Sequence, residues 1–158
     1  MNISIKKQSG VYILESHQRV NASLDKVWDF FTVPENLNAI TPSNINFKIT
    51  STNLQKIYSG QIIAYSIKIF PFIANNWITE ITFIKDKEFF IDEQRVGPYA
   101  MWHHEHHFKE IDNGVEMTDR VVFKLPMGVI GNFIAGKWVK NKVKSIFEHR
   151  FKVIENLF

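Results

Sequence analysis

The C-terminal part of the chain holds the feature that most constrains the fold, because it predicts one long amphipathic helix at Val129–Asn156. Apolar side chains recur there near helical spacing, and most of the lysines lie off that stripe. The stripe comprises Ile130, Ile134, Val139, Val143, Ile146, Phe147, Arg150, Phe151 and Ile154. A helix of this length needs a broad apolar surface to pack against, and an antiparallel sheet supplies one.

A series of strands precedes this helix. Side-chain alternation and turn residues predict seven of them, at about residues 11–20, 45–53, 61–70, 76–85, 88–96, 101–110 and 114–124. Asp112-Asn113-Gly114 is a strong hairpin signal, because Asn-Gly suits the positive φ of tight turns. The sequence thus predicts an α+β domain in which a seven-stranded curved antiparallel sheet wraps around the C-terminal helix and leaves a cavity on its concave side.

Two short helices are predicted between the first two strands. Leu24–Phe31 follows Ser23, a residue type favoured at the N-cap. Pro34–Ile40 begins at a proline and ends before Pro42.

Composition indicates a single globular domain over residues 1–158, with 45% apolar and 22% charged residues. The absence of cysteine excludes disulfides and thiolate chemistry. Residues 1–10 lack the apolar core of a signal peptide, and the longest apolar segment, Leu125–Ala135, is too short and interrupted to span a bilayer. We therefore expect a cytoplasmic protein without a transmembrane segment. The fourteen phenylalanines are compatible with either a packed core or a lined cavity.

Positive charge is concentrated near the C-terminus. Residues 124–158 contain seven Lys or Arg and two Glu, a sum of +5, whereas the rest of the chain sums to −2. A solvated helix face is the favoured interpretation, ahead of nucleic acid or anionic membrane, and no nucleic-acid-binding motif is present. The apolar loop around Met127, Val129 and Ile130 is expected to pack in the ordinary way, with a cavity lid or a weak membrane contact as alternatives.

Four of the six histidines lie between Met101 and Phe108. Alternation along a strand divides this segment into two faces. One face carries Trp102, His104, His106 and Phe108, and the other carries His103, Glu105 and His107. Neighbouring strands contribute two comparable faces, Phe90-Asp92-Gln94 and Met117-Asp119-Val121-Phe123.

A polar patch in an apolar cavity follows if these three faces all point to the concave side. It would contain Asp92, Gln94, His104, His106 and Asp119. An apolar lining with a few placed polar groups is typical of a small-molecule site. A purely structural network of Asp–His hydrogen bonds is the alternative, and the sequence leaves both open.

Motifs along most of the chain, about residues 11–155, resemble the START-like (SRPBCC) superfamily, which includes birch-pollen-allergen-like proteins and polyketide cyclases. The matching segments are residues 27–31, 34–37, 40–42, 77–81, 90–94, 97–99, 102–108, 117–121 and 125–128. The pattern is similar to a small bacterial branch whose members stand alone or are joined to an epimerase-like domain and labelled cell-division inhibitors. The resemblance implies a helix-grip fold with an internal ligand cavity, but no particular ligand.

A metal site is a more specific interpretation of the His-x-His pair than a general ligand site. His104 and His106, with Asp119 or Asp92, could converge on one ion. The resemblance argues against this site, because the superfamily is not generally metal-dependent, so we expect no metal and no other cofactor. The opposite face, with His103 and His107, is expected to be a solvated outer surface.

Binding of a hydrophobic small molecule, such as a lipid, isoprenoid, polyketide or quinone, is the leading functional prediction. The expected site residues are Trp77, Phe90, Asp92, Gln94, Trp102, His104, His106, Phe108, Asp119, Val143 and Phe147. One alternative is a cyclase or dehydratase-like enzyme with His104 or His106 as general base. Another is an interaction module that docks through the lysines of the C-terminal helix, and the sequence leaves the oligomeric state open.

Overall fold

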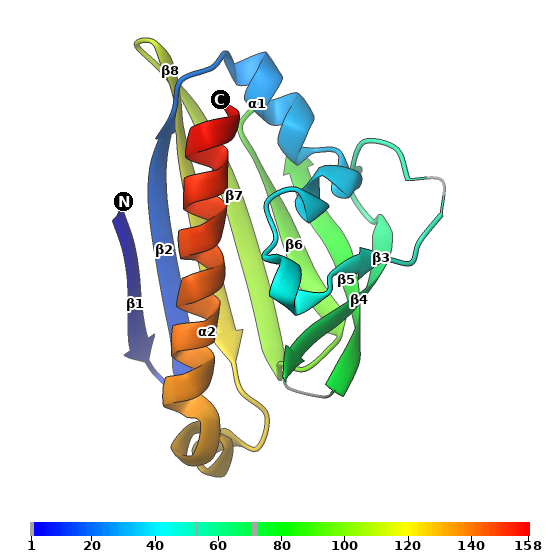
Figure 1. The fold of residues 1–158 in the computed structure, drawn as a ribbon, viewed down its shortest axis with the longest axis vertical. Coiled ribbons are helices and arrows are strands. Elements are labelled where there is room, and N and C mark those ends of the chain that lie inside the picture. The colour runs from blue at the N-terminus through cyan, green and yellow to red at the C-terminus, as the bar shows by residue number, and fades with distance from the viewer. Residues whose placement is uncertain (1, 53, 71–72) are drawn as a thin grey trace.

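The structure is a computed structural model that describes residues 2–52, 54–70 and 73–158. A curved antiparallel sheet of eight strands carries the long helix α2 (Gly128–Leu157) across its concave face (Figure 1). The sheet order is β1-β2-β8-β7-β6-β5-β4-β3. The strands are β1 Asn2–Gln8, β2 Val11–Val20, β3 Lys48–Ile49, β4 Ile62–Phe70, β5 Ile73–Lys85, β6 Phe89–Val96, β7 Met101–Ile111 and β8 Gly114–Lys124.

Three short helical segments cover the part of the concave face that α2 leaves open (Figure 1). They are α1 (Leu24–Phe31) and two 3-10 helices, η1 (Pro34–Asn38) and η2 (Ser43–Ile45). The Ser23 hydroxyl accepts a hydrogen bond from the Lys26 backbone N–H at 3.4 Å, so the predicted N-cap is confirmed. Trp28 of α1 is buried and meets Phe90 and Phe108 edge-on, at centroid distances of 6.1 and 5.4 Å. These contacts fix α1 over strands β6 and β7.

The predicted architecture is confirmed, but the predicted count of seven strands is wrong. The additional strand, β1, pairs with β2 along the edge of the sheet. Its alternation rests on Ile3 and Ile5 alone, and both are only half-buried, so the apolar signal is weak. Among the described residues, no helix has the length and apolarity needed to cross a membrane.

The predicted strand at 45–53 is also largely wrong: residue 53 lies outside the described residues, and within 45–52 only Lys48–Ile49 forms a strand. The 3-10 helix η2 occupies the start of that segment, and Asn46 after it takes a left-handed φ of 46°. The second predicted helix, at 34–40, is shortened to the 3-10 helix η1. Local alternation therefore overestimates regular structure where the chain turns between the helices and β4.

The β7–β8 hairpin predicted from Asn113-Gly114 is confirmed, with Ile111 paired to Gly114 and a positive φ of 61° at Asn113. Gly114 has φ of 151°, and a Cβ built on it would lie 2.3 Å from the Val20 carbonyl oxygen. Gly114 therefore permits a close approach between β8 and the end of β2.

Gly114→Ala is expected to lower the free energy of unfolding by on the order of 2 kcal/mol, because it adds both backbone strain and a clash. Gly60→Ala is the matched control, since Gly60 has φ of 86° but open space around its Cβ. Urea denaturation of both variants would separate strain from clash. A loss in Gly114→Ala no larger than that in Gly60→Ala would contradict the close approach.

Candidate functional site

Two imidazoles in close contact form the centre of the site. His104 and His106 leave the same face of β7, are both buried, and have ring centroids 3.7 Å apart. The register pairs His104 with Asp92 of β6 and His106 with Asp119 of β8. One carboxylate therefore lies on each side of the imidazole pair.

Hydrogen bonds link the two rings to the two carboxylates. His106 Nε2 lies 2.8 Å from Asp92 Oδ2, and His104 Nε2 lies 3.0 Å from Asp119 Oδ1. The remaining nitrogens complete the arrangement, with His106 Nδ1 3.1 Å from Asp119 Oδ1 and His104 Nδ1 3.5 Å from Asp92 Oδ2. All four ring nitrogens thus face a carboxylate oxygen within 3.5 Å.

Arg150 of α2 completes this group from the opposite side, and we call the five side chains together the Asp–His–Arg cluster. Its Nη2 lies 3.3 Å from Asp119 Oδ1 and 3.3 Å from His106 Nδ1. The guanidinium carbon also lies 5.2 Å from the ring centroid of Phe31 and 5.7 Å from that of Phe147. Arg150 is 7% exposed, and its Nε has no hydrogen-bond partner among the residues that the structure describes.

Helical spacing predicted Arg150 on the apolar stripe of the helix, and Arg150 was not among the expected site residues. An arginine on an otherwise apolar helix stripe was the signal that could have identified it, because a buried guanidinium requires anionic or π-electron partners.

The pKa values of the carboxyls follow from burial and from these contacts. Burial alone would raise the pKa of Asp119, but the Arg150 charge and the hydrogen bonds with both histidines lower it well below its usual range. Burial also opposes ionisation of Asp92, whose pKa the hydrogen bond from His106 and the nearby positive charges nevertheless lower. Both carboxyls therefore remain ionised in the interior.

The two histidines shift in opposite directions. Burial, reinforced by repulsion from His106, lowers the pKa of His104 to about 4 despite its carboxylate neighbours. In His106 the effect of burial is outweighed by the hydrogen bonds to Asp119 and Asp92, which raise its pKa. The distances agree with this difference. The ring nitrogens of His106 lie 2.8 and 3.1 Å from the two carboxylates, whereas those of His104 lie 3.0 and 3.5 Å from them. With His106 protonated and His104 neutral, the charges of the cluster sum to zero.

A cavity of about 190 Å³ lies beside the cluster, between the sheet, α2 and the segment that contains α1 and η1. Most of the predicted site residues line it, namely Trp77, Phe90, Asp92, Trp102, His104, His106, Val143 and Phe147. Further lining residues include Phe31, Ile40, Phe47, Ile63, Tyr65 and Arg150. Those from residues 30–65 were not predicted, because their place over the sheet depends on tertiary packing rather than on a local pattern.

Three predicted site residues do not line the cavity. Gln94 instead holds the turn before β7, because its side chain bonds both the backbone carbonyl and the backbone N–H of Tyr99, at 2.8 and 3.2 Å. Phe108 is buried against Trp28 and Phe31. Asp119 is 2% exposed and lies behind the histidines, so it supports the cluster from within the protein.

The other face of β7 carries a separate network on the outside of the sheet. Glu105 lies between His103 and His107, with Oε···Nε2 distances of 3.3 and 2.9 Å, and accepts a hydrogen bond from Arg120 at 2.6 Å. His103 and His107 are partly exposed. The four histidines therefore form two pairs on opposite faces, as the alternation predicted.

Asp92, His104 and His106 each place one ligand atom within 4.8 Å of the others, a spacing that a metal ion could use. Two features of the cluster oppose a cation there. The Arg150 guanidinium already lies 3.3 Å from His106 Nδ1, and the raised pKa of His106 favours a proton on the ring rather than a metal. A proton and a guanidinium supply the positive charge that the carboxylates require.

No protein-family model and no curated protein sequence matches the chain. Solved structures do match it over nearly its whole length. The Zhui aromatase/cyclase from Streptomyces sp. R1128 has a TM-score of 0.70 at 13% identity, covering 92% of each chain. A protein from Arthrobacter aurescens has a TM-score of 0.70 at 13% identity, covering 97% of this chain and 91% of its own. Ara h 8.0201 has a TM-score of 0.60 at 14% identity, with coverages of 91% and 97%.

At identities this low, the structural similarity establishes the fold but leaves the ligand and the reaction open. The resemblance read from the sequence motifs is confirmed at that level: the chain has the helix-grip fold of the START-like superfamily.

Proposed function

We propose that this chain binds a compact, mainly apolar molecule in the cavity, with the polar end of the molecule against Asp92 and Arg150. The composition of the cavity wall carries the proposal. Aromatic and aliphatic side chains form most of it, and the buried Asp–His–Arg cluster forms one side. Such a lining is typical of small-molecule sites. An aromatase/cyclase among the structures with this fold supports the same interpretation.

The size of the cavity limits the ligand. A cavity of about 150 Å³ is enough to bind benzene, and drug-sized ligands occupy about 300 Å³ or more. At about 190 Å³, this cavity suits a molecule of one ring with small substituents. A long-chain lipid would not fit within this volume.

The charges of the cluster favour a neutral ligand. Their sum is zero when His106 is protonated, so an anion beside Asp92 would be buried without compensation. Arg150 and Asp92 both line the cavity, so the guanidinium can donate to a carbonyl oxygen and the carboxylate can accept from a hydroxyl. We therefore propose a neutral carbonyl compound, such as a ketone or a quinone-like molecule.

Three probes of similar size test this preference, namely acetophenone, ethylbenzene and benzoate. Acetophenone is expected to bind about tenfold more tightly than ethylbenzene, because it alone accepts a hydrogen bond from a buried guanidinium without adding charge. Benzoate is expected to bind most weakly at neutral pH. The measurement is a titration followed by backbone amide chemical shifts, together with the fluorescence of Trp77 and Trp102, which line the cavity.

Neighbouring isoleucines on β4 provide a matched pair of variants. Ile63 is buried and lines the cavity, whereas Ile62 is half-exposed. Ile63→Trp should fill the cavity and abolish probe binding, and Ile62→Trp should leave it unchanged. Equal binding by both variants would refute the cavity as the site. Tighter binding of benzoate than of acetophenone would refute the preference for a neutral ligand while leaving the cavity in place.

A cyclase-like reaction with His104 or His106 as general base is the alternative. A base must offer a free nitrogen to its substrate. All four ring nitrogens already face carboxylate oxygens within 3.5 Å, so a proton transfer to either ring would first break one of these contacts. The geometry therefore favours binding over catalysis.

A further inference from the structure

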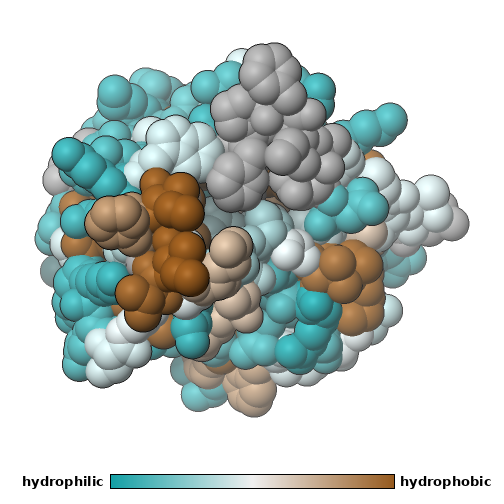
Figure 2. Space-filling model, turned by 90° about the horizontal axis from the view of Figure 1, so that it is seen from below, coloured by the Kyte–Doolittle hydropathy of each residue, from teal (hydrophilic) through white to brown (hydrophobic). Residues whose placement is uncertain are grey.

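The start of α2 exposes a group of large apolar side chains at one end of the molecule, and we call it the apolar tip. Its members are Met127, Val129, Ile130, Phe133 and Ile134. Phe133 is 91% exposed and Val129 86%, values unusual for side chains of this type. Figure 2, viewed from this end, shows hydrophobic side chains gathered there. The ordinary packing expected for this segment is therefore wrong.

The apolar tip is exposed because α2 begins beyond the ends of the neighbouring strands (Figure 1). The sheet supports the helix from Val139 onward, where the buried stripe starts, and not the first turns. A tight turn nonetheless holds the tip in place. Met127 and Gly128 have φ of 62° and 53°, and a Cβ on Gly131 would lie 2.0 Å from the Pro126 carbonyl oxygen.

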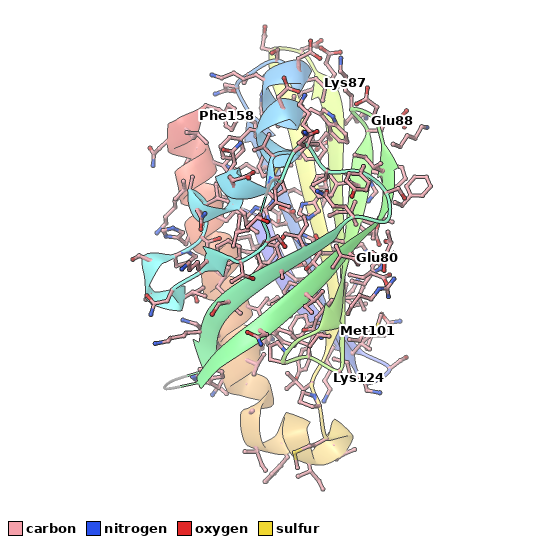
Figure 3. All side chains as sticks on the ribbon, turned by 90° about the vertical axis from the view of Figure 1, so that its right-hand side faces the viewer. Glu80, Lys87, Glu88, Met101, Lys124 and Phe158 are labelled. Atoms are coloured by element: carbon pink, nitrogen blue, oxygen red, sulfur yellow. The ribbon has the colours of Figure 1, made fainter. Side chains whose placement is uncertain are left out.

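Lysines flank the apolar tip along the chain. Between Asp119 and Glu148 the sequence contains one arginine and five lysines but no acidic residue. Lys124 and Lys137 are exposed, and Lys140 is partly exposed. Figure 3 places Lys124 at the same end of the molecule as the start of α2, with Met101 close by, and Lys87 at the opposite end.

We propose that the apolar tip docks the protein on an anionic lipid surface. Apolar side chains on one side of a helix, flanked by lysines, are the pattern with which interfacial helices enter the headgroup region. Residues 129, 130, 133 and 134 share one side of α2, so they can enter the membrane together. Each lysine near an anionic bilayer surface strengthens binding about fivefold. A protein partner would explain the apolar tip alone, whereas an anionic membrane explains both the tip and the lysines that flank it.

Flotation with vesicles tests this proposal on the full chain. Vesicles of phosphatidylcholine mixed with phosphatidylglycerol are expected to carry the protein, and pure phosphatidylcholine vesicles much less of it. Phe133→Ser should weaken binding about tenfold or more, because it removes the most exposed apolar side chain. Lys137→Gln together with Lys140→Gln should weaken binding to the anionic vesicles only.

Phe83→Ser is the matched control, since Phe83 is 47% exposed on β5 and stacks on Phe89, which follows Lys87 in the chain. Lys87 lies at the opposite end of the molecule from the start of α2 (Figure 3). It should bind vesicles as the wild type does. Equal losses in both serine variants, or equal binding to both kinds of vesicle, would refute the docking surface.

Light scattering without vesicles distinguishes a second copy of the chain as the occupant. We expect a monomer with and without Phe133→Ser. A dimer that this substitution dissociates would assign the apolar tip to self-association and overturn the proposal.

Discussion

Arg150→Met is expected to lower the free energy of unfolding by about 3–5 kcal/mol, because it leaves a buried carboxylate without its cation. Arg150 lies 3.3 Å from Asp119 Oδ1, and Asp119 is 2% exposed, so water cannot replace the guanidinium. Methionine retains much of the apolar contact with Phe31 and Phe147, so the loss reports the charge rather than the volume. Urea denaturation at neutral pH measures it.

Lys144→Met on the same helix is the control. Lys144 is half-exposed and pairs with Glu148 at 3.5 Å in an i,i+4 arrangement, so its removal should cost less than about 0.5 kcal/mol. Combining Arg150→Met with Asp119→Asn should recover part of the loss, because the unpaired charge is then gone. A cost below about 1 kcal/mol for Arg150→Met would show that the cluster is not held by its charges.

Stability is also expected to reach a maximum near pH 6.5, because the two histidines oppose each other. His104 has its pKa lowered from 6.5 to about 4, so between these values the unfolded chain binds a proton that the folded chain does not. Stability therefore falls as the pH drops through this window, by about 3 kcal/mol in all. The pKa of His106 is raised, so its contribution is complete below pH 6.5 and is lost as the pH rises through the folded value. Denaturation curves across this pH range measure both limbs.

Substitutions separate the two limbs of this profile. His104→Gln should remove most of the loss of stability between pH 6.5 and 4. The stability of this variant should fall only at the lower pH at which the carboxyls protonate. His107→Gln on the outer face of the same strand should preserve the shape of the profile, because its ring is partly exposed. A profile that is flat between pH 4 and 6.5 in the wild-type protein would contradict a buried, neutral His104.

The sequence predicted those parts of the site that depend on strand alternation. Alternation separated His104 and His106 from His103 and His107, and it placed Asp92 and Asp119 on matching faces of adjacent strands. Strand alternation could not predict the role of Arg150, because its contact with Asp119 depends on how the helix crosses the sheet.

Other errors have comparable physical causes. Gln94 shares a strand face with Asp92, but its amide is captured by the backbone of Tyr99 after the turn. The edge strand β1 was missed because only Ile3 and Ile5 mark its alternation. The apolar tip was expected to pack because composition alone does not reveal where the sheet ends.

The alternation of β7 also limits where residues can be inserted or deleted around this site. Adding or removing one residue between the start of β7 and His104 would exchange the two faces of the strand. The His103–Glu105–His107 set would then point into the protein, and the imidazoles of His104 and His106 would face water. Insertions and deletions should therefore be confined to the turns before Met101 and after Ile111.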